Sequence, residues 1–240
     1  RRVDLKSGGY LIIDPTEAGA QPMASACGRY MLVYNGEIYN YLDLRRMLED
    51  EGHAPAWRGH SDTEVLLAGV TAWGLAETLC RAVGMFAIAL WDRERRCLTL
   101  ARDRFGEKPL HVAVFDGEIA FASEIKALKR HPRWSGEIDR QAIALCLRRG
   151  YIPAPRTAFV QAVKLRPGAC VEITGETLGD PGDWRETLYW DVLDEARRAR
   201  ADRFAGSGEE AVDRLDSLLR SSVSGQMISD VPLGAFLSGG

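Results

Sequence analysis

The sequence predicts an α+β protein whose main part is layered as helix, sheet, sheet, helix. Residues 29–35 and 85–92 are apolar on both faces, which is typical of strands that are covered from both sides. Segments with the apolar spacing of helices lie between the strands without alternating strictly with them. A hydrophobic content of 46% against 27% charged residues provides enough apolar side chains for a globular core.

The first predicted elements are two strands and a helix. Residues 10–14 (YLIID) form a short strand that ends at a proline, because proline cannot donate to a sheet. Residues 29–35 form the next strand. Asn40 then caps a helix that runs through Glu51 and ends at Gly52. Its apolar face consists of Tyr41, Leu44, Met47 and Leu48.

A second helix begins at Ser61, because Ser61 and Glu64 have the spacing of a capping box, and it continues to Gly74. Two strands follow, at residues 85–92 and 97–103, with a charged turn between them.

A hairpin comes next, since residues 111–115 and 118–123 flank Asp116-Gly117, a strong two-residue turn signal. Beyond it, residues 139–149 form a helix with Ile143 and Leu147 facing inward.

The first of two predicted domains covers residues 1–173 and closes with a strand over residues 164–173. Residues 174–208 are rich in glycine and charge and are interpreted as a linker. Residues 209–240 begin a second domain. Its helix has apolar residues at helical spacing, namely Val212, Leu215, Leu218 and Leu219, and a buried strand then runs into a glycine-rich turn.

Composition excludes several classes of protein. A net charge of −3 lacks the basic excess that nucleic-acid binding needs, and no apolar run approaches the roughly 20 residues of a membrane span. The five cysteines form no CxxC pair and the four histidines no ligand-spaced cluster, so we expect reduced thiols, no metal site built by the protein, and a cytoplasmic location. The chain opens on Arg1 without a methionine and stops on Gly240, so we expect it to be part of a longer protein.

Two strand ends carry groups that could bind an anion. The Asn35 amide and the Gly36 N–H are suited to holding an oxyanion, although an Asn-Gly pair is also a common turn. Ser238, Gly239 and Gly240 follow a buried strand, where open α/β sheets present N–H groups to phosphate; a simple turn is the alternative.

Charged residues offer further candidates. Asp62 in the first turn of a helix is explained by the helix dipole, or it receives the ammonium group of a ligand. His53 and His60 are interpreted as surface histidines rather than bases. Residues 102–109 (RDRFGEKP) form either a solvated hairpin or a structured, charged loop near an active site.

The order of these motifs is more specific than any one of them. NGEIYN, GHSDTEVLL, GMFAIALWD, LARDRFGEKPL, FASEIKAL and DVPLGAFLSGG follow one another between residues 10 and 240, and this series resembles the bacterial B type of the glutamine-hydrolysing asparagine synthetase family. The resemblance implies a class II glutamine amidotransferase domain with the four-layer αββα fold of N-terminal-nucleophile hydrolases. An α/β ATP-pyrophosphatase domain is then expected to follow.

The resemblance also implies the chemistry. A free N-terminal cysteine attacks the amide of glutamine, and the ammonia reaches a β-aspartyl-AMP made from aspartate and ATP, with Mg²⁺ neutralising the phosphates. That cysteine would lie upstream of Arg1, so Cys27 is not assigned the role. The expected partners are these small molecules, with neither nucleic acid nor membrane, and a homodimer is allowed.

Site residues follow from the matching motifs. Asn35 and Gly36 match the oxyanion hole, which also contacts glutamine, and Glu37 and Asp62 match further glutamine-binding residues. Residues matching the ATP loop are Leu237, Ser238, Gly239 and Gly240.

One position departs from the family pattern. The ungapped register puts Gly9 where the family has the arginine that binds the glutamine carboxylate. Either Arg1 or Arg2 supplies this group across an insertion, or glutamine binding is weakened. Ile12 and Ile13 are therefore assigned to glutamine binding only as strand-edge contacts.

Three functions remain open from the sequence. The leading hypothesis is glutamine-dependent asparagine synthesis. A related amidotransferase could amidate a different carboxylate, because acceptor residues would lie beyond Gly240. A degenerate protein that binds glutamine without hydrolysing it is the third, motivated by Gly9.

Overall fold

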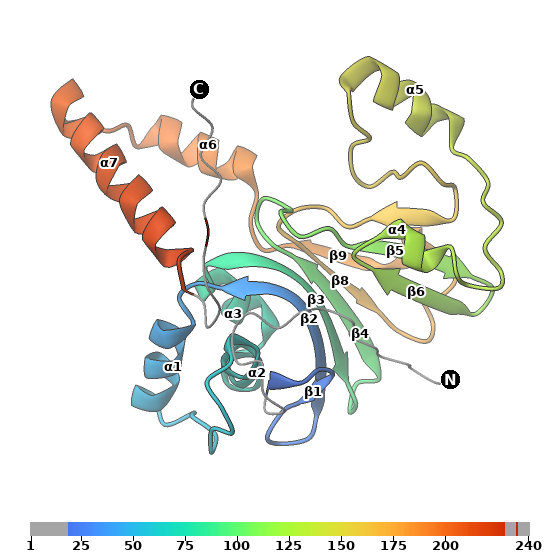
Figure 1. The fold of residues 1–240 in the computed structure, drawn as a ribbon, viewed down its shortest axis with the longest axis horizontal. Coiled ribbons are helices and arrows are strands. Elements are labelled where there is room, and N and C mark those ends of the chain that lie inside the picture. Colours follow the sequence, from blue (N-terminus) through green and yellow to red (C-terminus); the bar gives the residue numbers. More distant parts are fainter. Residues whose placement is uncertain (1–18, 229–233, 235–240) are drawn as a thin grey trace.

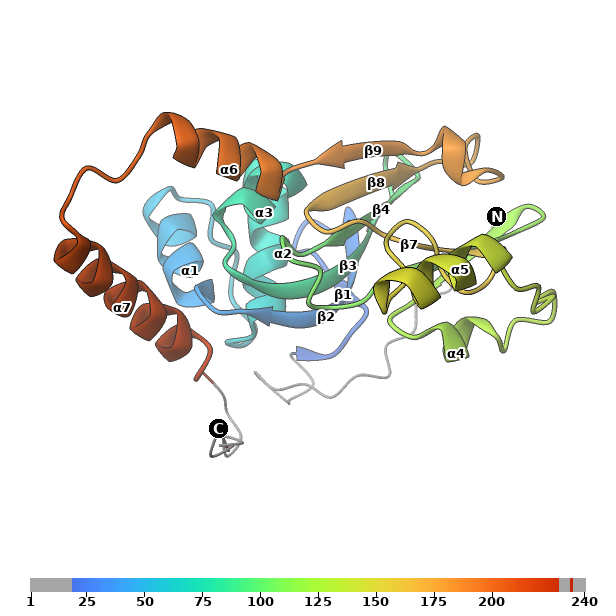
Figure 2. The same cartoon turned by 90° about the horizontal axis from the view of Figure 1, so that it is seen from above.

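The computed structural model describes residues 19–228 and residue 234, and its strands form two antiparallel sheets (Figures 1 and 2). The first sheet has six strands in the order β1 (Met23–Ala24), β2 (Tyr30–Ile38), β3 (Gly84–Asp92), β4 (Cys97–Arg102), β8 (Ala169–Ile173) and β9 (Arg185–Leu188). The second has three, in the order β6 (Glu118–Ala122), β5 (His111–Phe115) and β7 (Ala162–Lys164). The predicted strand at residues 10–14 lies outside the described residues.

Helices cover the outer faces of this pair of sheets. Three of them, α1 (Tyr41–Asp50), α2 (Asp62–Trp73) and α3 (Leu75–Arg81), pack on the first sheet (Figure 1). The short α4 (Ile125–Leu128) packs on the second sheet through Leu128. The order helix, sheet, sheet, helix confirms the predicted fold class.

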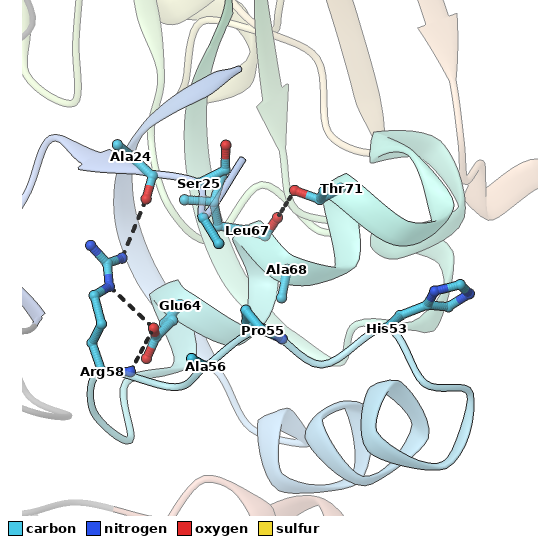
Figure 3. Close-up of a pocket in the computed structure, with 11 residues that line it drawn as sticks. Ala24, Ser25, His53, Pro55, Ala56, Arg58, Glu64, Leu67, Ala68 and Thr71 are labelled. Atoms are coloured by element: carbon cyan, nitrogen blue, oxygen red, sulfur yellow. Dashed lines mark hydrogen bonds and ion pairs between the residues drawn. The ribbon is translucent and has the colours of Figure 1, made fainter. Parts of the chain in front are cut away.

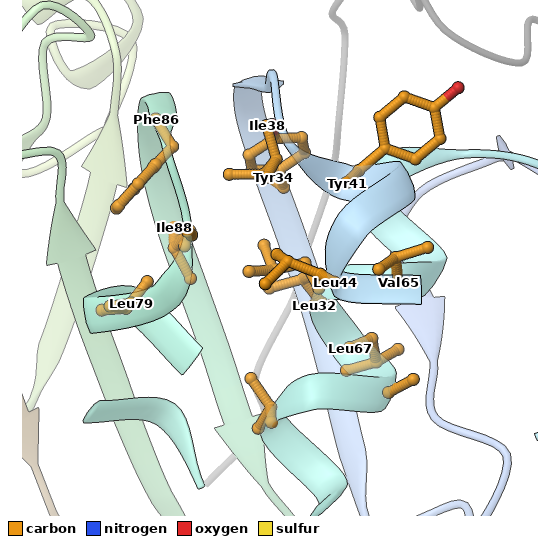
Figure 4. Close-up of a cluster of buried hydrophobic side chains, with 14 of the residues drawn as sticks. Leu32, Tyr34, Ile38, Tyr41, Leu44, Val65, Leu67, Leu79, Phe86 and Ile88 are labelled. Atoms are coloured by element: carbon orange, nitrogen blue, oxygen red, sulfur yellow. The ribbon is translucent and has the colours of Figure 1, made fainter. Parts of the chain in front are cut away.

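Three buried clusters fill the spaces between the layers. The first lies between the first sheet and α1–α3, where Leu32 and Leu44 are fully buried (Figure 4). Burying each such leucine contributes about 1.5–3 kcal/mol. The second cluster lies between the two sheets and includes Leu100 and Val112, and the third lies beneath α4.

Strand β2 is longer than predicted. It continues beyond Asn35 to Ile38, because its last residues pair with β3 in the register Gly36 to Phe86 and Ile38 to Gly84. The alternative of a turn at Asn35-Gly36 was therefore wrong, and both residues lie within a strand.

The helix at residues 41–50 is confirmed, with two differences. The Asn40 side chain does not cap it; its amide donates to the Arg81 carbonyl at 3.0 Å and its oxygen accepts from Val83 N at 2.8 Å. Met47 is exposed rather than packed with Leu44. Asn40 thus ties the start of α1 to the end of α3.

The helix after the hairpin forms as α5 (Arg140–Arg149), but its inward face was wrong. Asp139 caps it, Gly150 ends it in the left-handed conformation, and Ala142 is its only buried residue. Ile143 and Leu147 are exposed, Leu147 by 86%.

The strand predicted at residues 164–173 is confirmed only over its second half, as β8. Lys164 ends β7 in the second sheet, residues 165–168 form a connection in which Gly168 has a φ of +66°, and β8 in the first sheet follows. Hence this segment connects the two sheets.

Three ordered elements lie within the expected linker: the short 3-10 helix at Pro181–Asp183, strand β9 paired with β8, and helix α6 (Val192–Ala201). Helix α7 (Gly208–Gly225) confirms the last predicted helix and begins with a capping box of Ser207 and Glu210. The apolar face predicted for this helix is not covered by any described part of the chain, and its four residues are exposed: Val212, Leu215, Leu218 and Leu219. The division into two domains remains a prediction.

Within the described chain, every helix is too short or too polar to span a bilayer.

Candidate active site

The end of β2 presents two chemically different faces. Because side chains alternate along a strand, Tyr34 lies in the core beneath α2 while Asn35 lies on the face toward the second sheet. Val33 shares the face of Asn35 and packs in the core between the sheets. Asn35 itself is exposed, so it stands where this core opens to solvent.

The edge of β2 carries a row of N–H donors. Tyr34 N donates to Gln21 Oε1 at 2.6 Å, and Ile38 N donates to Asp62 Oδ2 at 2.9 Å. N–H groups two residues apart point to the same edge of a strand, so the Gly36 N–H lies between these two donors and faces the same way.

Close packing of β2 on β3 requires glycine at position 36. A Cβ on Gly36 would lie 2.1 Å from the Met85 carbonyl oxygen and 2.7 Å from the Phe86 Cα. Both contacts are with backbone, which cannot rotate away. Position 36 therefore cannot hold a larger residue unless β2 and β3 move apart.

Asp62 is a buried carboxylate held against β2. Its Oδ2 accepts hydrogen bonds from the Tyr34 hydroxyl at 2.8 Å and from Ile38 N, and its Oδ1 accepts from the Thr63 hydroxyl. Burial raises its pKa, and these hydrogen bonds partly offset the rise. No described lysine or arginine pairs with it.

Glu37 and Asn35 lie on the same face of β2. The Asn35 amide donates to the Ser123 hydroxyl at 2.9 Å. Burial raises the pKa of Glu37, while the charge of Lys108 lowers it. The face of β2 toward the second sheet is therefore polar at Asn35 and Glu37, where the strand ends.

The loop at residues 102–109 is structured and not a solvated hairpin. The Asp103 carboxylate is 1% exposed and accepts four backbone N–H groups, from Phe86, Phe105, Glu107 and Lys108, at 2.9–3.2 Å. The Arg102 guanidinium donates to the carbonyls of Gly106, Lys108 and Leu165. Through Phe86, this loop holds β3 opposite Gly36.

A separate cavity of about 300 Å³ is lined by α2, by residues 24–26 and by the segment between α1 and α2 (Figure 3). Glu64 lines it and accepts from Arg58 N and Gly59 N, so only the Ser61 half of the predicted capping box forms. Neither Asp62 nor residues 35–37 line this cavity. The two carboxylates of the SDTE motif consequently face different regions.

Four of the predicted site residues gather at the end of β2: Asn35, Gly36, Glu37 and Asp62. The other predicted residues lie outside the described part of the chain, namely Ile12, Ile13, Leu237, Ser238, Gly239 and Gly240. His53 lines the separate cavity.

Two residues at this site, Tyr34 and Ser123, were not predicted from the sequence, and Asp103 was predicted only as part of the loop at residues 102–109. A carboxylate directly after a buried strand and before a glycine-containing loop was a usable signal for Asp103. Tyr34 looked like an ordinary core residue, and Ser123 looked like the end of a hairpin strand.

Comparison with known families identifies two regions. The sequence model described as "Glutamine amidotransferase domain" matches residues 9–187, and the one described as "Asparagine synthase" matches residues 214–240.

Curated relatives carry matching names. "Asparagine synthetase [glutamine-hydrolyzing] 3" of Bacillus subtilis is 34% identical over 96% of this chain and 35% of its own length. "Putative asparagine synthetase [glutamine-hydrolyzing]" of Mycobacterium bovis is 39% identical over 88% of this chain and 31% of its own. The chain thus spans about a third of the length of these relatives.

Among solved structures, the glutamine phosphoribosylpyrophosphate amidotransferase of B. subtilis matches with a TM-score of 0.50 at 21% identity, over 73% of this chain and 33% of that one. This likeness supports the fold alone.

Proposed function

Since the chain belongs to the glutamine amidotransferase domain family, we propose that it hydrolyses glutamine as part of a longer asparagine synthetase. The observation that carries the proposal is Asp62, a buried carboxylate without a described lysine or arginine partner. It is bonded to β2 on both sides of residues 35–37, which include the two candidate oxyanion donors.

Each residue has a role in this proposal. Asp62 pairs with the α-ammonium group of glutamine, and this pairing sets the side-chain amide along the edge of β2. The Gly36 N–H and the Asn35 amide then donate to the oxyanion that forms when the nucleophile attacks the amide carbon. The nucleophile is the cysteine that family likeness places upstream of Arg1. Ammonia leaves, and water hydrolyses the thioester to give glutamate.

The ligase half of the reaction rests on the relatives. The match of residues 214–240 and the names of the relatives support transfer of ammonia to an aspartyl adenylate made from aspartate and ATP. ATP with Mg²⁺ would bind at residues 237–240. Among the described residues, no group of three His, Cys, Asp or Glu side chains could hold a metal ion. Five free thiols fit a cytoplasmic enzyme.

The test uses the full-length gene product with glutamine, ATP and Mg²⁺. Aspartate-dependent release of AMP and pyrophosphate, with asparagine and glutamate formed, would support the proposal. Glutamate formation with pyrophosphate release only for another carboxylate would identify a related amidotransferase. Tight glutamine binding without turnover would identify a sensor and refute the enzymatic proposal.

A further inference from the structure

One hydrogen bond joins the two sheets at the candidate site. The Asn35 amide, at the end of β2, donates to the Ser123 hydroxyl at 2.9 Å, although the two residues are 88 positions apart. Both side chains lie where the core between the sheets gives way to solvent. This bond can form only when the two sheets are packed together, because each sheet supplies one of its partners.

Ser123 is itself held in position. It follows β6 directly, and β6 pairs with β5 in the register His111 to Ala122. The Nδ1 of His111 lies 3.1 Å from the Ser123 carbonyl oxygen, and α4 begins two residues later, at Ile125. Ser123 is thus held between the end of β6 and the start of α4, with its hydroxyl toward Asn35.

His111 holds the Ser123 backbone in its neutral form. Burial lowers its pKa, the hydrogen bond to the Ser123 carbonyl partly offsets this, and the charges of Lys164 and Arg102 lower the pKa further. A neutral imidazole carries one N–H, and the contact with a carbonyl places it on Nδ1. His111 therefore donates to the Ser123 carbonyl.

An oxyanion donor has to be oriented before the reaction begins, because reorientation during the reaction reduces its benefit. Rotation of an asparagine amide about its last bond is broad and roughly two-fold, so an unheld amide would present its oxygen to the oxyanion as often as its nitrogen. The Ser123 hydroxyl accepts a hydrogen bond from one of the two N–H groups of Asn35, and this bond fixes the plane of the amide. The second N–H is left with a defined direction.

We propose that Ser123 is a positioning residue for glutamine hydrolysis, which orients the Asn35 amide toward the oxyanion. The inference rests on the proposed function, since it assigns Asn35 the donor role. It concerns kcat more than substrate binding, because the oxyanion forms only after glutamine is bound.

The experiment compares Ser123→Ala and Ser123→Thr in the full-length protein. We expect Ser123→Ala to lower glutaminase kcat by about 10- to 100-fold, somewhat less than the loss of a whole oxyanion donor. The glutamine KM should change less than about twofold, and ammonia-dependent synthesis should not change. Ser123→Thr keeps a hydroxyl at this position and should recover most of the kcat.

Ser135→Ala is the matched control. The Ser135 hydroxyl also bonds to a side chain in another segment, donating to Gln161 Oε1 at 2.7 Å, but away from β2. Its removal should leave kcat unchanged. In an Asn35→Ala background, Ser123→Ala should cost no further activity, because there is no amide left to orient.

Three outcomes would overturn the inference. Wild-type kcat in Ser123→Ala would show that the amide needs no partner, and an equal further loss in the Asn35→Ala background would show that Ser123 acts elsewhere. Loss of ammonia-dependent synthesis together with glutaminase activity would indicate a general structural role. Wild-type protein without glutaminase activity would instead refute the proposed function, and the inference with it.

Discussion

The Tyr34 hydroxyl donates a 2.8 Å hydrogen bond to the Asp62 carboxylate, which joins β2 to the first turn of α2. Both side chains are buried. A carboxylate that only capped the helix would not need this partner. The bond therefore ties the first turn of α2 to β2, a contact that the helix dipole alone does not require.

Asp62→Asn should make the protein more stable and bind glutamine less well. Asparagine keeps an oxygen for Tyr34 and Ile38 and presents its amide to the Thr63 hydroxyl, while the cost of the buried charge disappears. We expect a higher Tm at pH 7 and a glutamine KM raised at least about tenfold by loss of the charge-assisted bond. Ammonia-dependent synthesis should be unaffected.

The pH dependence of this variant gives a second readout. Because the fold raises the pKa of Asp62, protonation favours the folded state, and that contribution is lost as the pH rises through the raised pKa. The Tm advantage of Asp62→Asn should therefore shrink as the pH falls toward the ordinary aspartate pKa of 3.8. A lower Tm than wild type at pH 7 would contradict this account and favour the capping role.

Gly36→Ala should destabilise the protein, because its Cβ would collide with the backbone of β3. We expect a loss of about 2 kcal/mol or more in urea unfolding, together with loss of glutaminase activity. Gly179→Ala is the control, since a Cβ there meets nothing within 4 Å, and it should change stability by less than about 0.5 kcal/mol. Similar effects of the two substitutions would show that β2 and β3 are not so close.

Asp103→Asn should loosen the loop at residues 102–109. The amide of asparagine would place a donor against N–H groups that need an acceptor, so we expect a loss of roughly 2–4 kcal/mol by denaturant unfolding. Asp116→Asn, in the exposed hairpin turn, keeps a favoured turn residue and should be neutral. If Asp103→Asn unfolds at the wild-type urea concentration, the carboxylate does not organise the loop.

The cysteines should differ in reactivity. Hydrogen bonding, chiefly from the Ser25 hydroxyl 3.2 Å away, lowers the pKa of the exposed Cys27, whereas burial raises the pKa of Cys170 to about 12. Iodoacetamide at pH 8 should therefore label Cys27 well before Cys170, as followed by mass spectrometry, and Ser25→Ala should slow labelling of Cys27.

Cys27 is not assigned the catalytic role. Cys27→Ser should accordingly leave glutaminase kcat within about twofold of wild type. Complete loss of activity would require the nucleophile to be reassigned.

Local signals in the sequence predicted much of the fold. The two-sided strands, the Asp116-Gly117 hairpin and the Ser61 cap depend on neighbouring residues, and all three are present. The Pro167-Gly168 break could also have been predicted, since this pair is a turn signal. Local chemistry is therefore a sufficient guide wherever the determining contacts are short-range.

Features set by distant residues could not be predicted. Strand β2 runs through Asn35 and Gly36, both poor strand formers, because β3 pairs with them from about 50 positions away. Leu147 has the spacing of a buried helix face, but no described element covers that face. The partner of Asn35 depends on how the two sheets pack, which no local pattern encodes.

The most direct test of the central claim is Asn35→Ala in the full-length protein, assayed for glutaminase activity and for ammonia-dependent amide synthesis. Removal of an oxyanion donor should lower glutaminase kcat by about 10²–10³-fold, with little change in glutamine KM and with synthesis from ammonia retained. Wild-type glutaminase activity in Asn35→Ala would contradict the account, because the end of β2 could not then be the site of glutamine hydrolysis.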